Sequence, residues 1–412
     1  MKINCIKLYE YSLYLIVFLY LGFINLFKDL NSISISIDFL ITICLFVIFL
    51  IQKNKHMNNY KYVSFYIISF YIIFIIDLFR LKTFSLSGYT ISDALVHDRY
   101  YIFLLLVFPI SEILFSKRRQ KFIINIYYIG VLILIFRFFA WYIYNKLHFN
   151  VAPGYFQVMG YEWARMGLTR LSGSFLDNYV WVMALIRILK NISLKEIIKN
   201  GVVLFICFGY AAIVYNSRSQ EIAYLVVLAI YFLLSTPKIY IKILIVLSSF
   251  IIIPIIEKGS LFVNFISTFS VTNSDYGSST QIRTNTLNIY QSLWLKENIW
   301  LGYGISNDGN YFSNSSANMI NQSDLGIISS LYQFGIVGFL IMISPFIMAF
   351  FISLKYLNHI ENKFLFLFSI STLLTSIMSQ NMYDPFRSLI IPFLLAFIVY
   401  VNVKNKEGKK NE

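Results

Sequence analysis

Apolar runs about 20 residues long recur from one end of this 412-residue chain to the other. A run of that length is what an α-helix needs to cross the ~30 Å hydrocarbon layer of a membrane. Because backbone groups in hydrocarbon must satisfy their own hydrogen bonds, such runs fold as packed transmembrane helices. Only 13% of the residues are charged, against about 25% in soluble proteins. The sequence therefore predicts an all-α polytopic membrane protein.

We expect about twelve transmembrane helices, which together form a single membrane domain over residues 1–412. The expected spans are 8–27, 33–51, 61–79, 99–116, 122–144, 174–190, 198–215, 220–235, 238–256, 325–353, 364–381 and 387–403. The first resembles a signal sequence but is too long and lacks a small-residue cleavage site, so we expect it to stay uncleaved.

The basic residues predict the orientation of these helices. With twelve spans, 21 Lys and Arg lie on the side of the two termini and 12 lie on the other side. Cytoplasmic loops carry the excess of positive charge, so both termini are expected in the cytoplasm, with the protein in the cytoplasmic (inner) membrane. The net charge of +14 is therefore a topology signal, and no nucleic-acid partner is expected.

This topology places three polar segments outside, at residues 80–98, 145–172 and 257–324. The last is rich in Ser, Thr and Asn and contains Gly302-Tyr303-Gly304. Such a stretch cannot cross hydrocarbon. It still carries aromatic residues such as Trp294 and Trp300, which disordered linkers lack. We expect 257–324 to be a large extracytoplasmic loop that folds as a cap or lid, with a helix near residues 284–296.

Arginine and lysine are distributed unequally between the two sides. Of the 23 Lys, 18 fall on the cytoplasmic side, whereas only three of the 11 Arg do. Arg137 lies in the outer half of a span, and the other seven are outside: Arg80, Arg99, Arg165, Arg170, Arg218, Arg283 and Arg387. A guanidinium fork binds phosphate or carboxylate bidentately, so the group favours a polyanionic substrate. For any single arginine, the alternative is pairing with an outer carboxylate or a lipid headgroup.

Three of the outer polar residues are candidates for chemistry. Arg218 sits in a very short turn between apolar helices, where charge is expensive and usually functional; the alternative is an ion pair with Glu221. Arg170 precedes the point where the chain re-enters the membrane, where it could instead be an interfacial anchor. Asp324 ends the polar loop and could act as a general base or only cap the next helix. Weaker candidates for the base are Asp177, Asp275, Asp308 and Asp384.

Several chemistries are not expected. The four His (56, 97, 148 and 359) have no metal-like spacing, so no metal site is predicted. The three Cys form no disulfide framework. No phosphate-binding glycine loop occurs, so we expect no nucleotide cofactor.

Four segments together resemble the O-antigen polymerase and O-antigen ligase superfamily, which includes the Wzy-type capsular polysaccharide polymerases. Thr169-Arg-Leu-Ser-Gly-Ser-Phe175 is similar to the family's Arg-x-x-Gly-x-Phe, and Asn216-Ser-Arg-Ser219 to its Ser-Arg-Ser/Gly turn. Residues 298–305 (NIWLGYGI) resemble its Pro-x-x-Gly-x-Gly segment without the proline, and 324–338 its closing segment. Ligases of the superfamily carry a His where this chain has Asp324, which favours a polymerase.

The resemblance implies a GT-C-like glycosyltransferase that acts without a cofactor on a lipid-pyrophosphate-linked oligosaccharide and releases undecaprenyl pyrophosphate. It implies catalytic roles for Arg218 and Asp324, and substrate binding by Arg165, Arg170, Arg283, Gly302 and Gly304. Expected partners are other polysaccharide assembly proteins, such as a flippase and a chain-length regulator. A ligase is the nearest alternative. A flippase is a second one, but mid-span charges are scarce and no repeat is evident, which disfavours transport.

Overall fold

The computed structural model describes residues 5–20, 31–52, 57–84, 91–152, 164–165, 167–190, 193–234, 277–304, 325–378, 382–383 and 387–411. The first part of the chain consists of consecutive helices: α1 (Cys5–Tyr20), α2 (Asn31–Ile51), the 3₁₀-helix η2 (Met57–Tyr60), α3 (Lys61–Phe84), α4 (Ile91–Asp98), the 3₁₀-helix η3 (Arg99–Leu106), α5 (Val107–Phe115) and α6 (Arg119–Leu147).

A short hairpin separates these helices from the second part. Its antiparallel strands β1 (Ala164–Arg165) and β2 (Leu168–Thr169) pair Ala164 with Thr169. The helices that follow are α8 (Asp177–Lys190), α9 (Leu194–Gly209), the π-helix η4 (Tyr210–Val214), α10 (Arg218–Leu234), α13 (Gly277–Glu297), α15 (Ile328–Leu354), α16 (Ile360–Met378) and α17 (Ile390–Asn411).

Helices α8 and α17 form the centre of the bundle. Residues 175–186 and 388–401 are buried without interruption, so neither helix has an exposed face over these stretches. A helix that is buried on all sides needs neighbours on all sides. Helix α16 packs against both, and also against α10 and α15. The Tyr179 ring of α8 contacts Phe368 of α16 and Phe393 of α17, with centroid distances of 5.9 and 6.5 Å.

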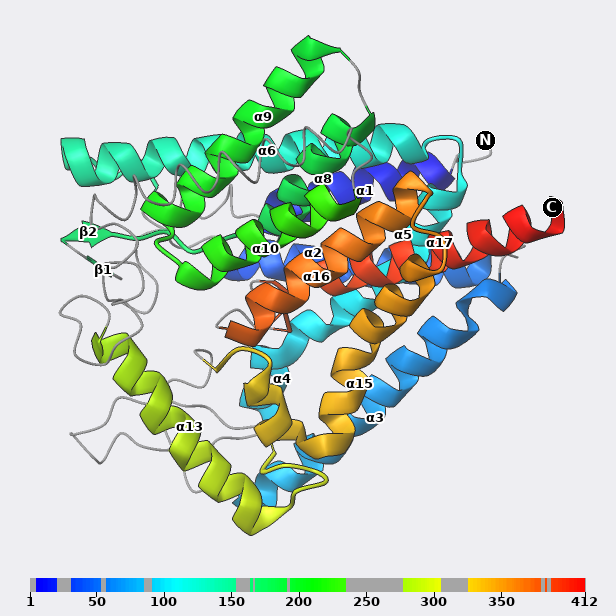
Figure 1. The fold of residues 1–412 in the computed structure, drawn as a ribbon. Helices are drawn as coiled ribbons and strands as arrows, with labels where there is room; N and C mark the ends of the chain where they lie inside the picture. Colours follow the sequence, from blue (N-terminus) through cyan, green and yellow to red (C-terminus); the bar gives the residue numbers. More distant parts are fainter. Residues whose placement is uncertain are drawn as a thin grey trace.

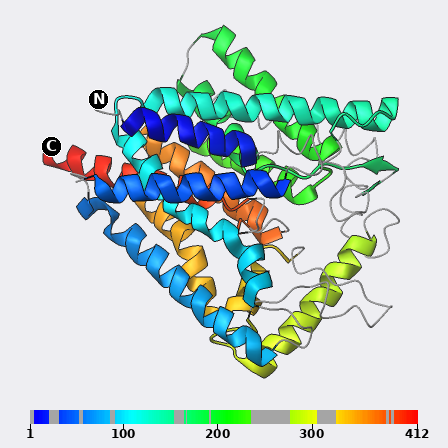
Figure 2. The ribbon, with the colours of Figure 1, turned by 180° about the vertical axis from the view of Figure 1, so that it is seen from behind.

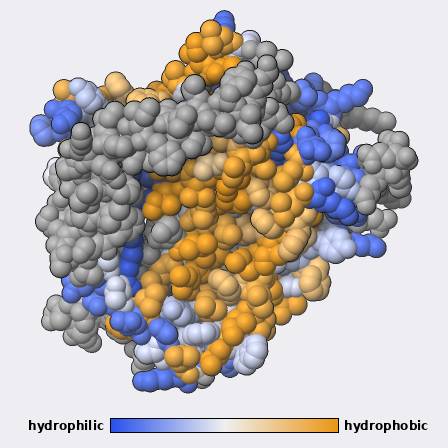
Figure 3. Space-filling view, viewed as in Figure 1, coloured by the Kyte–Doolittle hydropathy of each residue, from blue (hydrophilic) through white to orange (hydrophobic). Residues whose placement is uncertain are grey.

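The outer helices turn large apolar side chains away from the protein. Phe65 and Phe79 of α3 are each 73% exposed, and Phe205 of α9 is 80% exposed. Figure 3 shows a broad hydrophobic face on the side seen in Figure 1. Soluble monomers rarely expose apolar patches of this extent, whereas hydrocarbon solvates them. The protein is therefore a membrane protein built of α-helices, as the sequence predicts.

Within the described ranges, five helices are long and apolar enough to cross a membrane: Lys61–Arg80, Arg119–Leu147, Leu194–Val214, Ile328–Leu354 and Ile360–Ile377. The expected span 238–256 lies outside the described residues. The count of twelve spans and the GT-C-like architecture stay predictions. Helix α1 begins and α17 ends at one end of the bundle, while α13 and the hairpin lie at the opposite end, which we call the α13 end (Figures 1 and 2).

Two expected helices have a different geometry in the structure. The span expected at 99–116 is the 3₁₀-helix η3 followed by α5, and Pro109 lies in the first turn of α5, where a proline ring is well tolerated. The span expected at 325–353 begins at Ile328 and is interrupted at Gly335, whose φ of 66° is not helical.

Helix α9 begins at Leu194 rather than near 198, because the Ser193 side chain accepts the Glu196 N–H and caps the helix.

The turn that follows α13 provides hydrogen-bond partners for the backbone groups at the Gly335 kink. A kink leaves backbone groups of the helix without their usual partners. Residues 300–304 supply them: Tyr303 N donates to Tyr332 O at 3.0 Å, and Val337 N donates to Trp300 O at 3.2 Å. We call this contact the glycine crossing, since Gly302 and Gly335 let the two backbones meet. A Cβ on Gly335 would lie 2.2 Å from Trp300 O.

Aromatic side chains extend this contact to α13. Tyr290 of α13 stacks on Tyr303 with ring centroids 5.2 Å apart, and Trp294 lies 5.7 Å from Tyr332 of α15. Tyr290, Tyr303 and Tyr332 are all buried. The helix expected near 284–296 is thus found, as α13, and it is fastened to α15 at the α13 end of the bundle.

Replacing Gly335 with Ala should strongly destabilise the protein. A positive φ alone costs ~1–3 kcal/mol for a residue with a side chain, and at this position the new Cβ also meets backbone. We therefore expect a clear fall in the unfolding temperature of the detergent-purified protein. Gly201→Ala in α9 is the matched control, because nothing lies within 4 Å of its added Cβ. Equal unfolding temperatures for the two variants would contradict the crossing.

Candidate functional site

The turn between η4 and α10 is built to hold Arg218 at a buried position. The π-helix widens the last turn before it, so that Tyr215 N donates to Tyr210 O at 2.8 Å. Asn216 then takes a left-handed conformation with a φ of 49°. Ser217 O accepts the N–H groups of Gln220 and Glu221 and starts α10. Arg218 is only 7% exposed there. π-Helices are rare and occur frequently at functional sites.

Arg170 lies beside this turn. Leu171 N donates to Val214 O at 3.2 Å, and Arg170 Nη1 donates to Asn216 O at 3.4 Å. The preceding residue is held from the other side, since Thr169 N donates to Asn145 Oδ1 at 2.8 Å and Asn145 Nδ2 donates to Thr169 O at 3.0 Å. Arg170 is 6% exposed. The structure thus brings together Arg170 and Arg218, two of the residues expected at the site.

Two further arginines reach the same region. Arg137 of α6 donates to Ser172 O at 3.1 Å, and this carbonyl also accepts the Tyr210 hydroxyl at 2.9 Å. Arg387, just before α17, donates from Nη2 to the Tyr215 hydroxyl oxygen at 3.3 Å. We call Arg137, Arg170, Arg218 and Arg387 the arginine group. These hydrogen bonds from Arg137 and Arg387, like that from Arg170 to Asn216 O, go to neutral oxygen atoms.

Two described carboxylates, those of Asp177 and Glu221, interact with this group. Asp177 is 5% exposed and accepts hydrogen bonds from the N–H of Ser174, at 2.8 Å, and from its hydroxyl. Arg137 and Arg387 both interact electrostatically with Asp177, and Arg218 does so with Glu221. Buried guanidinium groups are expensive unless a group of opposite charge lies near them, so several arginines gathered at one turn suit a negatively charged ligand.

The other expected site residues are placed differently. Gly302 and Gly304 belong to the turn after α13, where Gly302 forms the glycine crossing and Gly304 N donates to Gln333 O at 2.9 Å. Arg283 lies on α13, partly buried. Arg165 is in β1, and only its backbone is described. Asp324 lies outside the described residues, so its role as base or cap stays a prediction.

Arg80 has a structural role that the sequence did not predict. Its Nη1 and Nη2 donate to the carbonyl oxygens of Leu301 and Gly302, each at 2.6 Å, and Nη1 also lies 3.3 Å from Oδ1 of Asp77, which is 1% exposed. Arg80 is therefore engaged with the protein itself. It fastens the turn after α13 to the end of α3.

From the sequence, Arg387 was expected only as a member of the outer arginine set, and Arg137 only as a residue in the outer half of a span. A signal for Arg137 was available, because a charged residue inside an apolar span is costly and usually has a polar partner or a function. The position of Arg387 depends on α17 returning beside the 214–218 turn, which no local pattern reveals. Among the described residues, no group of three His, Cys, Asp or Glu could hold a metal ion.

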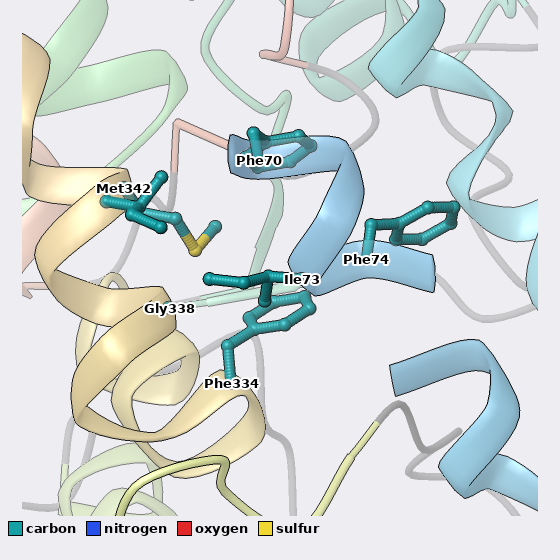
Figure 4. A pocket seen from close by; sticks show the side chains of 7 residues that line it. Phe70, Ile73, Phe74, Phe334, Gly338 and Met342 are labelled. Carbon is teal, nitrogen blue, oxygen red and sulfur yellow. The ribbon is translucent and has the colours of Figure 1, made fainter. Parts of the chain in front are cut away.

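Two pockets among the described residues are apolar and do not suit a sugar. Figure 4 shows the one between α3 and α15, where Ile73, Phe334 and Met342 point toward one another. The two helices lie close together here, since a Cβ added at Gly338 would lie 3.4 Å from Ile73 Cγ2, an ordinary van der Waals distance. A second lies between α15 and α16, lined mainly by Phe346, Phe350, Phe351 and Ile370. Hydrocarbon chains fit such surfaces better than hydroxyl groups do.

Comparison with known proteins gives a family match for one segment of the chain. Residues 203–343 match the family model described as O-antigen ligase. The match includes Arg218, Arg283, the glycine crossing and Asp324, whereas Arg137, Arg170 and Arg387 lie outside it. The resemblance to the O-antigen polymerase and ligase superfamily is confirmed by this match. No curated protein matches the chain.

Replacing Arg80 with Gln should loosen the attachment of α13. The change would leave buried Asp77 without its partner, and breaking such a pair costs ~3–5 kcal/mol. We expect a lower unfolding temperature and faster tryptic cleavage after Lys296, which is exposed at the end of α13. Arg187→Gln is the control, because its pair with Glu196 is more exposed and such pairs contribute little. Cleavage at the wild-type rate in Arg80→Gln would show that Arg80 does not anchor α13.

Proposed function

We propose that the protein is a glycosyltransferase that polymerises oligosaccharide repeat units on the outer face of the cytoplasmic membrane. It would transfer the growing glycan from its undecaprenyl pyrophosphate carrier to the next lipid-linked unit and release undecaprenyl pyrophosphate. The observation that carries the proposal is the arginine group: Arg137, Arg170 and Arg218 are buried, and Arg218 lies within the segment that matches the O-antigen family model.

The chemistry of the transfer explains why the arginines matter. A hydroxyl oxygen of the acceptor sugar attacks the anomeric carbon of the donor, and the bond from that carbon to the pyrophosphate oxygen breaks. Negative charge then develops on the leaving pyrophosphate. Donors held in place before the reaction stabilise that charge most effectively where water is excluded. Arg170 and Arg218, each less than 10% exposed, are suited to this task.

The attacking hydroxyl must lose a proton during the transfer. Asp324 is the proposed general base, since it follows the long polar loop in the sequence and immediately precedes the described segment that leads into α15. Arg165 and Arg283 are proposed to bind more distant parts of the anionic substrate. Helix α13, together with the glycine crossing, is proposed to form part of a lid over the site.

A ligase is the second candidate, because the matching family model is described as O-antigen ligase. Such an enzyme would transfer a finished glycan from the same kind of carrier to another acceptor. The arginine group serves both reactions, since pyrophosphate leaves in both. The glycan products of a gene-deletion strain separate the candidates: single repeat units on lipid indicate a polymerase, and full-length chains on lipid a ligase. Accumulation facing the cytoplasm would instead indicate a flippase.

Arg218→Lys should abolish polymer while the protein remains in the membrane. Lysine keeps the charge but cannot donate two parallel hydrogen bonds to a phosphate, and losing one such donor costs roughly a hundredfold or more in rate. The measurement is a gel of surface polysaccharide from a deletion strain that carries each variant.

Arg187→Lys is the control for this experiment. It changes the same residue type, but Arg187 contacts Glu196 and lies over the rings of Tyr127 and Tyr128, away from the arginine group. We expect normal polymer from this variant. Polymer of wild-type length and amount from Arg218→Lys would contradict the proposed role.

A further inference from the structure

A chain of buried side-chain hydrogen bonds links three helices next to the arginine group. Gln220 Nε2 of α10 donates to Asn178 Oδ1 of α8 at 2.8 Å, and Asn178 Nδ2 donates to Thr375 Oγ1 of α16 at 3.0 Å. Their exposed fractions are 4%, 6% and 2%, respectively. Thr375 passes the chain on to its own helix by donating to Thr372 O at 2.9 Å. We call Gln220, Asn178 and Thr375 the amide relay.

Each helix in the amide relay carries or holds a segment of the proposed site. Gln220 lies in the first turn of α10, two residues after Arg218. Asn178 follows Asp177, which binds Ser174 in the segment that begins with Arg170. On α16, the residue after Thr375 accepts a backbone hydrogen bond, from Ile327 N to Ser376 O, at 2.7 Å. Ile327 is three residues beyond Asp324 in the sequence.

We infer that Asn178 is a positioning residue that sets the register of the Arg170, Arg218 and 325–327 segments against one another; this inference rests on the proposed function. Asn178 is the centre of the relay because it is both an acceptor from α10 and a donor to α16. Apolar packing alone permits helices to slide and rotate by small amounts, whereas a buried amide fixes both partners in place. In a low-dielectric interior, losing either hydrogen bond leaves a polar group unsatisfied.

The relay can be tested with the purified full-length protein, its lipid-linked repeat unit and Asn178→Leu. A small misplacement of reacting groups costs up to about a hundredfold in rate, so we expect kcat to fall roughly tenfold to a hundredfold. KM for the lipid-linked donor should stay within about threefold, because the relay itself does not touch substrate.

Asn362→Leu is the matched control. Asn362 is 1% exposed and exchanges two amide hydrogen bonds with Asn405, at 3.0 and 3.1 Å, between α16 and α17. It is also a buried asparagine that joins two helices, but it lies in the first turn of α16, remote from Thr375 near the opposite end. We expect the kcat of Asn362→Leu to equal that of the wild type, even where its unfolding temperature is the same as that of Asn178→Leu. Equal losses in the two variants would mean that any buried amide matters, and would overturn the inference.

An exchange of side-chain lengths keeps the test decisive if Asn178→Leu fails to fold. Asn178→Gln and Gln220→Asn should each lower kcat, because one lengthens and the other shortens the connection. The double variant restores the total length of the connection between α8 and α10, although not that to Thr375, and should recover part of the kcat. Additive losses in the double variant would overturn the inference. A wild-type protein that transfers no glycan would contradict the proposed function itself, and the inference with it.

Discussion

The construction of the candidate site depends on the free-energy cost of burying arginine side chains where water is scarce. Arg137, Arg170 and Arg218 are each less than 10% exposed and lie around one turn of the chain, with Arg387 beside them. A bundle of apolar helices gains nothing from such charge unless an anion balances it. The widened π-turn, the left-handed Asn216 and the carbonyl oxygens at Ser172 and Asn216 all serve to hold these guanidinium groups.

The α13 end of the molecule combines two kinds of construction. Around the 214–218 turn, polar side chains from several helices converge. At the glycine crossing, by contrast, backbone meets backbone, and Arg80 holds the turn through the carbonyl oxygens of Leu301 and Gly302. The 214–218 turn is suited to binding a substrate, whereas the glycine crossing attaches α13 to α15. Glycines that resemble a substrate-binding motif in sequence therefore have a described role in fastening α13 to α15 and α3.

Much of the helical layout is predictable from the sequence, because apolar length and capping are local properties. The expected span 122–144 is α6 (Arg119–Leu147). The kink at Gly335 is not predictable in this way, since its backbone partners come from a turn more than 30 residues earlier. Arg80 with Leu301 and Asn178 with Thr375 are likewise long-range pairs. The unequal distribution of Arg and Lys between the two sides predicted that most arginines lie on one side. It did not predict which four form the arginine group.

The central claim is that the arginine group binds the pyrophosphate of a lipid-linked glycan. A structure of the protein with undecaprenyl pyrophosphate bound tests it most directly. The account predicts that the diphosphate lies within hydrogen-bonding distance of Arg170 and Arg218, with its hydrocarbon chain directed along the apolar helices. A diphosphate bound elsewhere, with the Arg170 guanidinium still directed at Asn216 O, would contradict it.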